Sequence, residues 1–276
     1  MRSFENKVAV VTGAASGIGR ALAQQLAQRG AALALVDVNA AALAETAASV
    51  AATGRRVTTH VADVADAARM EALAEEAVAQ HGRVELLINN AGVSVTGTLE
   101  EQSLDDWRWI VGVNFWGVVH GCKFFLPHLR KNAEAHIVNL SSMFGLIGLP
   151  TQSSYCATKF AVRGLSEALW AELYGSGIGV TSVHPGGVKT NIVRDSRTAD
   201  ANAKQQMIER FDRMAMTPEK AAAKILRAVE RNELRVVICP EARVADWAKR
   251  LFPAGVHQLV ARGYRRFGAS GARSEP

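Results

Sequence analysis

The stretch Val8-Ala-Val-Val-Thr-Gly-Ala-Ala-Ser-Gly-Ile-Gly-Arg20 joins a short apolar run to a helical pattern through a turn with glycines at 13, 17 and 19. Glycine allows both a tight turn and a close approach of the backbone to a ligand. A phosphate at the start of a helix meets free amide groups and the positive end of the helix dipole. The spacing is GxxxGxG and not GxGxxG, so the pattern predicts a phosphate-binding turn, with a ligand-free strand-to-helix turn as the alternative.

Outward from this turn, short apolar runs alternate with longer segments of helical spacing. Several runs lack polar alternation, which is typical of strands buried on both faces of a sheet. The expected strands are Val8–Thr12, Ala32–Val36, Val57–Val61, Leu86–Ile88, His136–Leu140, Val180–Val183 and Val236–Ile238. The expected helices are Ile18–Gln28, Ala40–Ala52, Ala67–Gln80, Leu104–Leu129, Ser154–Tyr174 and Pro218–Glu230. This order predicts an α/β fold of the Rossmann type, a doubly wound parallel sheet of about seven strands with helices on both faces.

The composition agrees with a folded domain that has a large core. The chain has 276 residues, and 49% of them are hydrophobic. Its three cysteines, at 122, 156 and 239, are too far apart for a disulfide framework or a metal-binding pair, which favours a reducing, cytoplasmic setting. The histidines show no ligand spacing, so no metal site is expected. No apolar run reaches about 18 residues, and the first residues lack a signal-peptide core.

Asp37 ends the second expected strand, 18 residues after Gly19. An acidic side chain at this place can accept hydrogen bonds from an adenosine ribose, and it would repel a 2′-phosphate. No basic residue follows it, and Ala15 and Ser16 bring no cation into the glycine turn. The alternative role is the N-cap of the next helix, for which Asn39 is better placed. Asp37 therefore favours NAD over NADP.

The segment Tyr155-Cys-Ala-Thr-Lys159 places a phenol and an ammonium group four residues apart. On a helix these side chains share one face, and a nearby cation lowers the pKa of a tyrosine toward that of a useful acid or base. Many such pairs are merely neighbours. Here the preceding strand ends in Asn139-Leu-Ser-Ser142, which brings hydroxyl groups to the carboxyl edge of the sheet, where ligands bind in such folds.

Together these patterns extend over most of the chain. Over about residues 5–240 the sequence resembles the short-chain dehydrogenase/reductase family. The motifs that carry the resemblance are Thr12–Gly19, Asp63-Val64, Asn89-Asn-Ala-Gly92, Asn114, Ser142, Tyr155 with Lys159, and Pro185-Gly186 with Thr190. Ser142 is preferred to Ser141 because the family serine lies thirteen residues before the tyrosine.

The resemblance implies four catalytic residues. Tyr155 would transfer a proton to or from the substrate oxygen, and Ser142 would orient the carbonyl or alcohol. Lys159 would lower the pKa of Tyr155 and bind the nicotinamide ribose. Asn114, in the expected helix Leu104–Leu129, would help to hold a water that relays protons through Lys159.

The resemblance also implies a nicotinamide dinucleotide, which supplies the hydride chemistry. Asp63 and Val64 would contact adenine, and the segment from Pro185 to Thr190 would hold the nicotinamide. The full set of expected cofactor contacts is Gly13, Ser16, Gly17, Ile18, Gly19, Asp37, Asp63, Val64, Asn90, Ala91, Gly92, Tyr155, Lys159, Pro185, Gly186, Val188 and Thr190.

The expected substrate side is mostly apolar. It comprises Val93, Ser94, Met143, Phe144, Leu149, Gln152, Gly187 and Met214. The set contains no Arg or Lys that would clamp a carboxylate or phosphate. We therefore expect a secondary alcohol or ketone with an apolar body, and the alternative is that these side chains only fill the core. The segment 191–216 is expected to be a substrate lid, like the variable segment of the family.

The positive charge of the chain lies in its last part. The net charge is +6, and residues 243–276 contain seven Lys or Arg and two Asp or Glu. Residues 1–240 are therefore expected to form one nearly neutral catalytic domain, and residues 241–276 a basic helical extension. Apolar residues at helical spacing in the extension predict a helix pair packed on the domain or on a subunit partner. The alternative is a basic amphipathic anchor at an anionic membrane surface.

Other functions are weighed against an NAD-dependent oxidoreductase. A dinucleotide-binding regulator without turnover would be signalled by loss of Tyr155 or Lys159, and both are present. Nucleic-acid binding is suggested only by the charge, because helix-turn-helix, zinc-finger and aromatic RNA-binding patterns are absent. An NADP-dependent reductase of the same family remains the rival. The resemblance makes a homodimer or homotetramer expected, through the helices that contain Asn114 and Tyr155.

Overall fold

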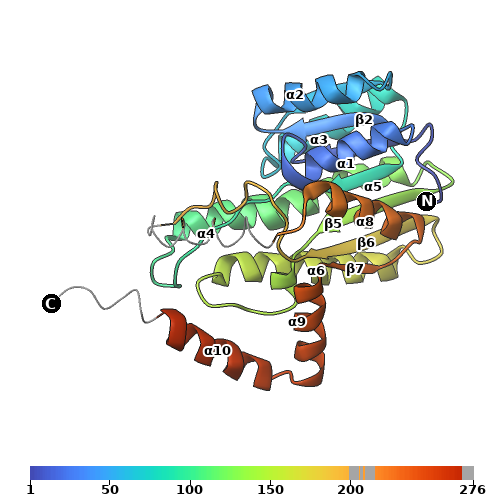
Figure 1. Cartoon of the computed structure of the whole chain (residues 1–276). Helices are drawn as coiled ribbons and strands as arrows, with labels where there is room; N and C mark the ends of the chain where they lie inside the picture. Colours follow the sequence, from blue (N-terminus) through green and yellow to red (C-terminus); the bar gives the residue numbers. More distant parts are fainter. Residues whose placement is uncertain (199–204, 206–207, 209–214, 269–276) are drawn as a thin grey trace.

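The computed structural model describes residues 1–198, 205, 208 and 215–268, and within them one parallel sheet forms the centre of the molecule (Figure 1). The strands follow the order β3-β2-β1-β4-β5-β6-β7. Their bounds are β1 Val8–Thr12, β2 Ala32–Asp37, β3 Val57–Val61, β4 Leu86–Asn89, β5 Ala135–Leu140, β6 Ile178–Pro185 and β7 Arg235–Ile238. The predicted doubly wound sheet is confirmed, and each expected strand is present with its bounds extended by at most two residues.

Helices cover both faces of the sheet because alternate side chains of each strand point to opposite sides. In β1, Ala9 and Val11 belong to one apolar core, whereas Val8 and Val10 belong to another. The first core is closed by α1 Gly17–Gln28, α2 Ala40–Ala51 and α8 Pro218–Glu230. The second is closed by α3 Ala67–His81, α5 Gly117–Leu129 and α6 Ser153–Glu172.

The expected helix Leu104–Leu129 contains an irregular turn. It consists of α4 Leu104–Val111, a π-helical segment Gly112–Trp116 and α5. By length and composition this 26-residue helix could cross a membrane, but half of its most apolar window is buried inside the protein, as in the core helix of a globular domain. The π-helical segment carries Asn114, and such segments are frequent at functional sites.

Two helices follow the last strand. They are α9 Pro240–Leu251 and α10 Gly255–Gly268, separated by a break at Phe252–Ala254. In Figure 1, α9 leads away from the sheet and α10 turns sharply and runs back below α6. We call these two helices the arm. Of the expected helical extension 241–276, residues 241–268 are thus helical except at this break, and residues 269–276 lie outside the described residues.

Candidate active site

The glycine turn brings the ends of β1, β4 and β6 close together. Gly13 and Gly17 have positive φ angles of 64° and 52°, which favour glycine. A Cβ atom on Gly13 would lie 2.8 Å from the Cα of Ala91, and one on Gly17 would lie 2.9 Å from Cγ2 of Thr190. Three segments that the sequence assigns to the cofactor thus meet at one edge of the sheet.

The start of α1 leaves backbone donors available for an anion. Ser16 is the N-cap residue, yet its side chain makes no capping hydrogen bond. The first amide groups of a helix have no partner inside the helix, so they can bind a phosphate. This donor set and the close packing of the glycine turn fit the diphosphate of a dinucleotide.

Asn90 serves the turn itself. Its Nδ2 donates hydrogen bonds to the carbonyl oxygens of Thr12 and Gly13, at 2.9 and 3.1 Å. The amide of Ala91 donates to Oγ1 of Thr12 at 3.1 Å. Since its Nδ2 and its backbone amide are engaged, Asn90 can offer a ligand only its carbonyl oxygens, and it fixes the shape of the phosphate-binding turn.

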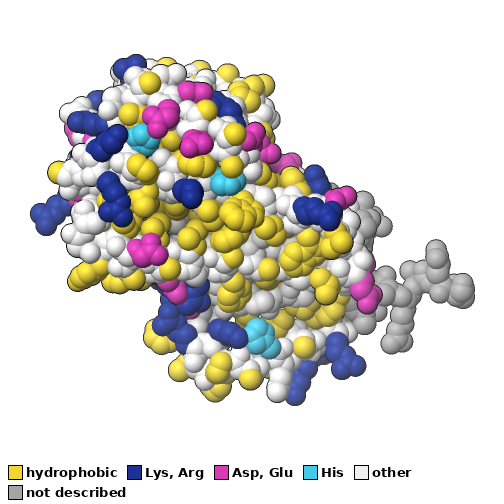
Figure 2. All heavy atoms as spheres, turned by 180° about the vertical axis from the view of Figure 1, so that it is seen from behind, with side chains coloured by type: hydrophobic (Ala, Val, Ile, Leu, Met, Phe, Trp, Pro, Cys, Tyr) yellow, Lys and Arg dark blue, Asp and Glu magenta, His cyan; other side chains and the backbone are white. Residues whose placement is uncertain are grey.

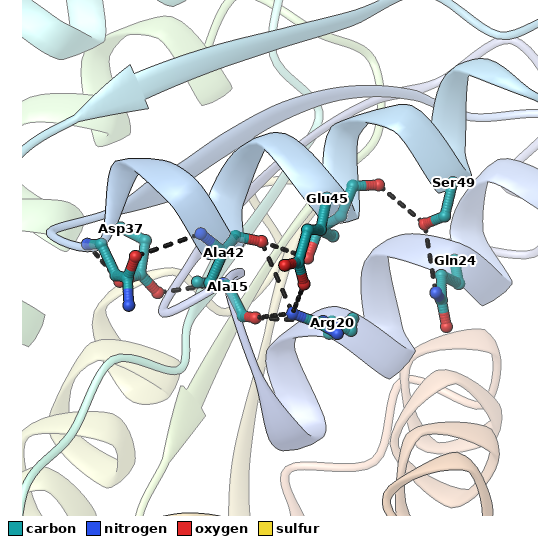
Figure 3. A network of polar contacts seen from close by, with 9 residues as sticks. Ala15, Arg20, Gln24, Asp37, Ala42, Glu45 and Ser49 are labelled. Atoms are coloured by element: carbon teal, nitrogen blue, oxygen red, sulfur yellow. Dashed lines mark hydrogen bonds and ion pairs between the residues drawn. The ribbon is translucent and has the colours of Figure 1, made fainter.

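Asp37 is held rigidly beside this turn (Figure 3). Its Oδ2 accepts from the amide of Ala15 at 3.0 Å, and its Oδ1 accepts from the amide of Asn39 at 2.9 Å. The side chain of Asn39 caps α2 by accepting from the amide of Ala42. The prediction that Asn39 and not Asp37 caps the helix is confirmed, and the half-exposed carboxylate of Asp37 binds the glycine turn instead.

Arg20 is a cation near this site that the sequence pattern did not reveal. Its guanidinium donates two hydrogen bonds to the carbonyl of Ala15, from Nη2 at 2.6 Å and from Nε at 3.0 Å, and Nη2 lies 3.2 Å from Oε2 of Glu45 (Figure 3). Arg20 directly follows Gly19, and the first turn of α1 brings its side chain back to the Ala15 carbonyl, five residues earlier. Its charge is matched by Glu45.

Asp63 and Val64 follow β3. One carboxylate oxygen of Asp63 accepts from the amide of Ala65 at 2.9 Å and so closes its own turn. Val64 is buried against Gly117 of α5. Nδ1 of His120 lies 2.9 Å from the carbonyl oxygen of Val64. These contacts fix the loop at the place where the sequence predicts the adenine.

Tyr155 and Ser142 lie together at the carboxyl edge of the sheet. Tyr155 lies in the first turn of α6, and its ring packs edge-on against Phe144 at 5.9 Å between centroids. Burial raises the pKa of Tyr155 to about 12, although a hydrogen bond with Ser142 lowers it in part. The hydroxyl of Ser142 also accepts from the amide of Phe144 at 3.1 Å.

Lys159 is buried one turn further along α6. Its Nζ donates to the carbonyl of Leu140 at 2.9 Å and lies 5.6 Å from the centre of the Tyr155 ring. Burial lowers the pKa of Lys159 to about 8. The expected lowering of the tyrosine pKa is therefore not seen, because the loss of solvation on burial outweighs the hydrogen bond with Ser142.

The two neighbouring serines have different partners. The hydroxyl of Ser141 donates to the carbonyl of Lys159 at 2.7 Å and ties α6 to β5. Ser142 instead faces Tyr155 and η2, the short 3-10 helix Met143–Gly145. Behind it, Nδ1 of the buried His184 lies 3.1 Å from the carbonyl oxygen of Ser142. Burial lowers the pKa of His184 to about 4, so this histidine is neutral and supports the strand end.

Asn114 connects the catalytic residues with the end of β4. Its Oδ1 accepts from the amide of Val93 at 2.8 Å, and its Nδ2 donates to the carbonyl of Val93 at 2.9 Å. A Cβ atom on Gly92 would lie 3.3 Å both from Oδ1 of Asn114 and from Nζ of Lys159. The structure thus brings all four expected catalytic residues to one end of the sheet.

The segment after β6 is held by the arm as well as by the domain. The amide of Gly187 donates to Oε1 of Glu241 at 2.9 Å, and Sγ of Cys239 lies 3.6 Å from the Gly187 carbonyl. That carbonyl also accepts from the amide of Met216 at 2.9 Å. Glu241 was not among the expected site residues, since the sequence places it in an extension beyond the catalytic domain.

An apolar cluster borders Tyr155 on the side expected to hold the substrate. It contains the expected Val93 and Phe144, and also Val95, Trp109, Ile110, Val111 and Ile192. Gln152 donates to Oγ1 of Thr96 at 3.0 Å and is almost fully buried, so its role is structural. Met214 lies outside the described residues.

A cation does lie at the outer side of this cluster. The guanidinium of Arg197 stacks over the Trp109 ring at 3.7 Å and pairs with Asp106 at 3.1 Å. The backbone of Arg197 also bridges to Ser94 and Thr96. The sequence predicted no Arg or Lys on the substrate side, and the position of Arg197 shows that this prediction is wrong. The flat face of its guanidinium contacts Trp109, and its charge is paired with Asp106. Within the expected lid 191–216, the segment 191–198 is attached to the outer side of this cluster through Arg197.

The comparisons with known proteins agree with this geometry. A family model described as short chain dehydrogenase matches residues 7–201. The chain belongs to the short-chain dehydrogenase/reductase family. SadH of Mycobacterium tuberculosis, which is named as an oxidoreductase, is 45% identical over 271 residues, which are 97% of this chain and 98% of SadH. The meso-2,3-butanediol dehydrogenase of Serratia marcescens is 43% identical over 189 residues, 68% of this chain and 74% of that protein.

The fold has the same relatives. The solved structure of a short-chain dehydrogenase/reductase from Burkholderia phymatum in complex with NAD superposes with a TM-score of 0.84 at 33% identity, and the match covers 91% of this chain and 95% of that one. This protein is a short-chain dehydrogenase/reductase oxidoreductase acting on alcohols or carbonyl compounds and binding NAD(P). Among the described residues, no group of three or more His, Cys, Asp or Glu could hold a metal ion.

Proposed function

We propose that this member of the family interconverts a secondary alcohol and its ketone by hydride transfer with NAD(H). The observation that carries the proposal is the meeting of Tyr155, Ser142, Lys159 and Asn114 at the edge of the sheet where the glycine turn also lies. When bound, the nicotinamide would accept or donate the hydride. The residues of this chain would bind and orient the reactants and move the proton.

In the direction of oxidation, Tyr155 would take the proton of the substrate hydroxyl, and in reduction it would return a proton to the carbonyl oxygen. Ser142 would hold that oxygen beside the phenol. Lys159 is mostly protonated at neutral pH, since its pKa of about 8 lies above it. Its ammonium would favour the phenolate form of Tyr155 and bind the nicotinamide ribose, and Asn114 would support the proton relay.

The preference for NAD rests on Asp37. Its carboxylate ends β2, is oriented by two backbone amides and would repel a 2′-phosphate. Arg20 lies near enough to the turn to favour NADP by binding a 2′-phosphate, which is the rival proposal. Its guanidinium, however, already binds Glu45 and the Ala15 carbonyl. A dinucleotide-binding regulator without turnover is disfavoured because the four catalytic side chains are all present and converge.

The substrate class rests on the apolar cluster around Tyr155. Val95, Ile110 and Phe144 offer no charged group to a ligand, and the nearby Arg197 is paired with Asp106. The relative from Serratia marcescens is named for a secondary alcohol. These observations support an alcohol or ketone with an apolar body.

Steady-state kinetics across a panel of alcohols test this assignment. We expect kcat/KM with NAD to be at least about tenfold higher for apolar secondary alcohols than for small hydroxy acids of equal length, because burying an unpaired carboxylate costs several kcal/mol. Highest turnover of anionic hydroxy acids would contradict the substrate class. Tighter binding of NADPH than NADH in the same series would contradict the cofactor preference.

We also propose that the chain forms a homodimer or homotetramer through the helices that carry Asn114 and Tyr155. Trp116, the last residue of the π-helical segment, and Phe160, on α6, are large apolar side chains that remain partly exposed. Hydrophobic side chains gather across the middle of the face shown in Figure 2. The three cysteines are buried and unpaired, in keeping with a cytoplasmic setting.

A further inference from the structure

The first helix of the arm is attached to the domain by its polar side. Asp246 pairs with Arg235 of β7, Glu241 accepts from the amide of Gly187, and Nε of Arg243 donates to the Val237 carbonyl at 3.3 Å. Ala242, on the same side, is fully buried. These contacts fix the direction in which α9 leaves the sheet.

The opposite side of α9 is apolar and faces away from the domain. Val244, Trp247 and Leu251, spaced three and four residues apart, are 69%, 64% and 64% exposed. On a helix they form one stripe, turned about 170° from Ala242. This orientation is the reverse of an ordinary surface helix, which buries its apolar stripe. The extension was predicted to pack on the domain or on a subunit partner, and this stripe does not pack on the domain.

The stripe continues through the break into α10. Phe252, Leu259 and Tyr264 are also exposed, and the apolar surface from Val244 to Tyr264 is called the arm face. Lys249 closes the break by donating to the Pro253 carbonyl at 2.9 Å and by contacting His257 at 2.6 Å. An exposed apolar surface of this extent on a soluble domain marks an interaction site.

This chain itself carries a surface that complements the arm. The described part of α10 contains Arg262, Arg265 and Arg266 and no acidic residue, and basic side chains gather in the lower part of Figure 2, where the arm lies. The segment 99–106, at the start of α4, has the sequence Leu-Glu-Glu-Gln-Ser-Leu-Asp-Asp, with four carboxylates and no basic residue. Its Leu99 and Leu104 are 66% and 71% exposed.

The free charge of this segment lies on Glu100 and Glu101. Asp105 pairs with Arg108 and Asp106 with Arg197, whereas no ion pair of Glu100 or Glu101 is found within the described residues, and Glu101 accepts from the amide of Thr98. Exposed leucines flanked by carboxylates thus match exposed apolar residues flanked by arginines. In Figure 1, α10 and the helix α4 lie on different sides of the loop before α6.

We propose that the arm binds a second copy of this chain, with the arm face on the segment 99–106 of that copy. This interface is separate from the one proposed through Trp116 and Phe160. The apolar contacts supply the affinity, and the complementary charges fix the register.

Sedimentation velocity of the full chain tests the proposal. Trp247→Asp with Leu251→Asp is expected to remove one association step, so that the mass falls to half or less at micromolar concentration. Tyr174→Asp, at another exposed aromatic residue just after α6, is the matched control and leaves the mass unchanged. An unchanged mass of the double variant overturns the proposal. Flotation of the same proteins with vesicles of phosphatidylcholine and phosphatidylglycerol distinguishes the rival: vesicle binding that depends on Trp247, with unchanged mass, also overturns it.

Charge reversal tests whether the arm binds the segment 99–106 of the second copy. Arg265→Glu and Glu100→Arg are each expected to weaken the association about tenfold, because each places like charges together. Mixing the two variants brings reversed residues face to face and restores the wild-type mass for the mixed pair. A mixture that stays at the lower mass overturns the placement on the segment 99–106.

Discussion

Replacing Tyr155 with Phe is expected to lower kcat by about 100- to 10,000-fold, the range that a positioned acid or base contributes. The ring still packs against Phe144, so the fold and the cofactor contacts persist, and only the ionisable hydroxyl is lost. The dissociation constant for NADH should therefore change less than about threefold. Steady-state kinetics and a fluorescence titration of NADH measure the two quantities on one preparation.

Tyr174→Phe provides the matched control, since it removes a phenol that is exposed at the end of α6. We expect its kcat to equal that of the wild type. Residual activity of the Tyr155→Phe variant above about a tenth of the wild-type kcat would show that the proton is transferred by another group. A large loss of NADH affinity would show that the variant disturbs the site as a whole.

Replacing Asp37 with Ser is expected to weaken NAD binding about 10- to 100-fold. The carboxylate would form charged hydrogen bonds to the ribose hydroxyls, and such bonds contribute about 1.5–3 kcal/mol. The binding of NADP should improve at the same time, because the repulsion of the 2′-phosphate is removed and Arg20 lies next to the turn. The ratio of kcat/KM for NAD to that for NADP measures both effects.

Asp66→Ser is the control that tests whether the loss of any aspartate near the strand ends would change the ratio of kcat/KM for NAD to that for NADP. Asp66 caps α3 by accepting from the amide of Arg69, and serine can also cap a helix. We expect the cofactor ratio of this variant to match the wild type. If Asp37→Ser left the ratio unchanged, the proposed preference for NAD would lose its basis.

The sheet and its helices were predictable because their signals are local. Continuous apolar runs such as Val8–Thr12 and Ala32–Val36 identify buried strands, and the glycine turn marks the carboxyl edge. Asn114 lies in an irregular segment that helical periodicity alone does not reveal, since the residues on both sides continue the same helix. The helical spacing in the arm was also readable, but its orientation was not, because which face a helix buries depends on polar contacts such as Asp246 with Arg235.

Residues that reach the site through tertiary contacts were not predictable. Arg197 and Glu241 lie outside the recognisable motifs, and they contact the site through a ring and an amide of other segments. Arg20 directly follows the glycine turn, but its spacing does not reveal that its guanidinium binds the Ala15 carbonyl. The pKa of Tyr155 is a further case. The spacing to Lys159 predicted a lowered value, whereas the depth of burial, which spacing does not encode, raises it to about 12.

The central claim is that a hydride passes between a secondary alcohol and NAD in this site. The most direct measurement uses the full chain with NAD and an apolar secondary alcohol that carries deuterium on the carbon bearing the hydroxyl. Mass spectrometry of the reduced cofactor should find one deuterium per NADH, with the ketone as the other product and the hydroxyl proton passed through Tyr155. Reduced cofactor without deuterium, or no reduction with any secondary alcohol under conditions where NADH binds, would contradict the claim.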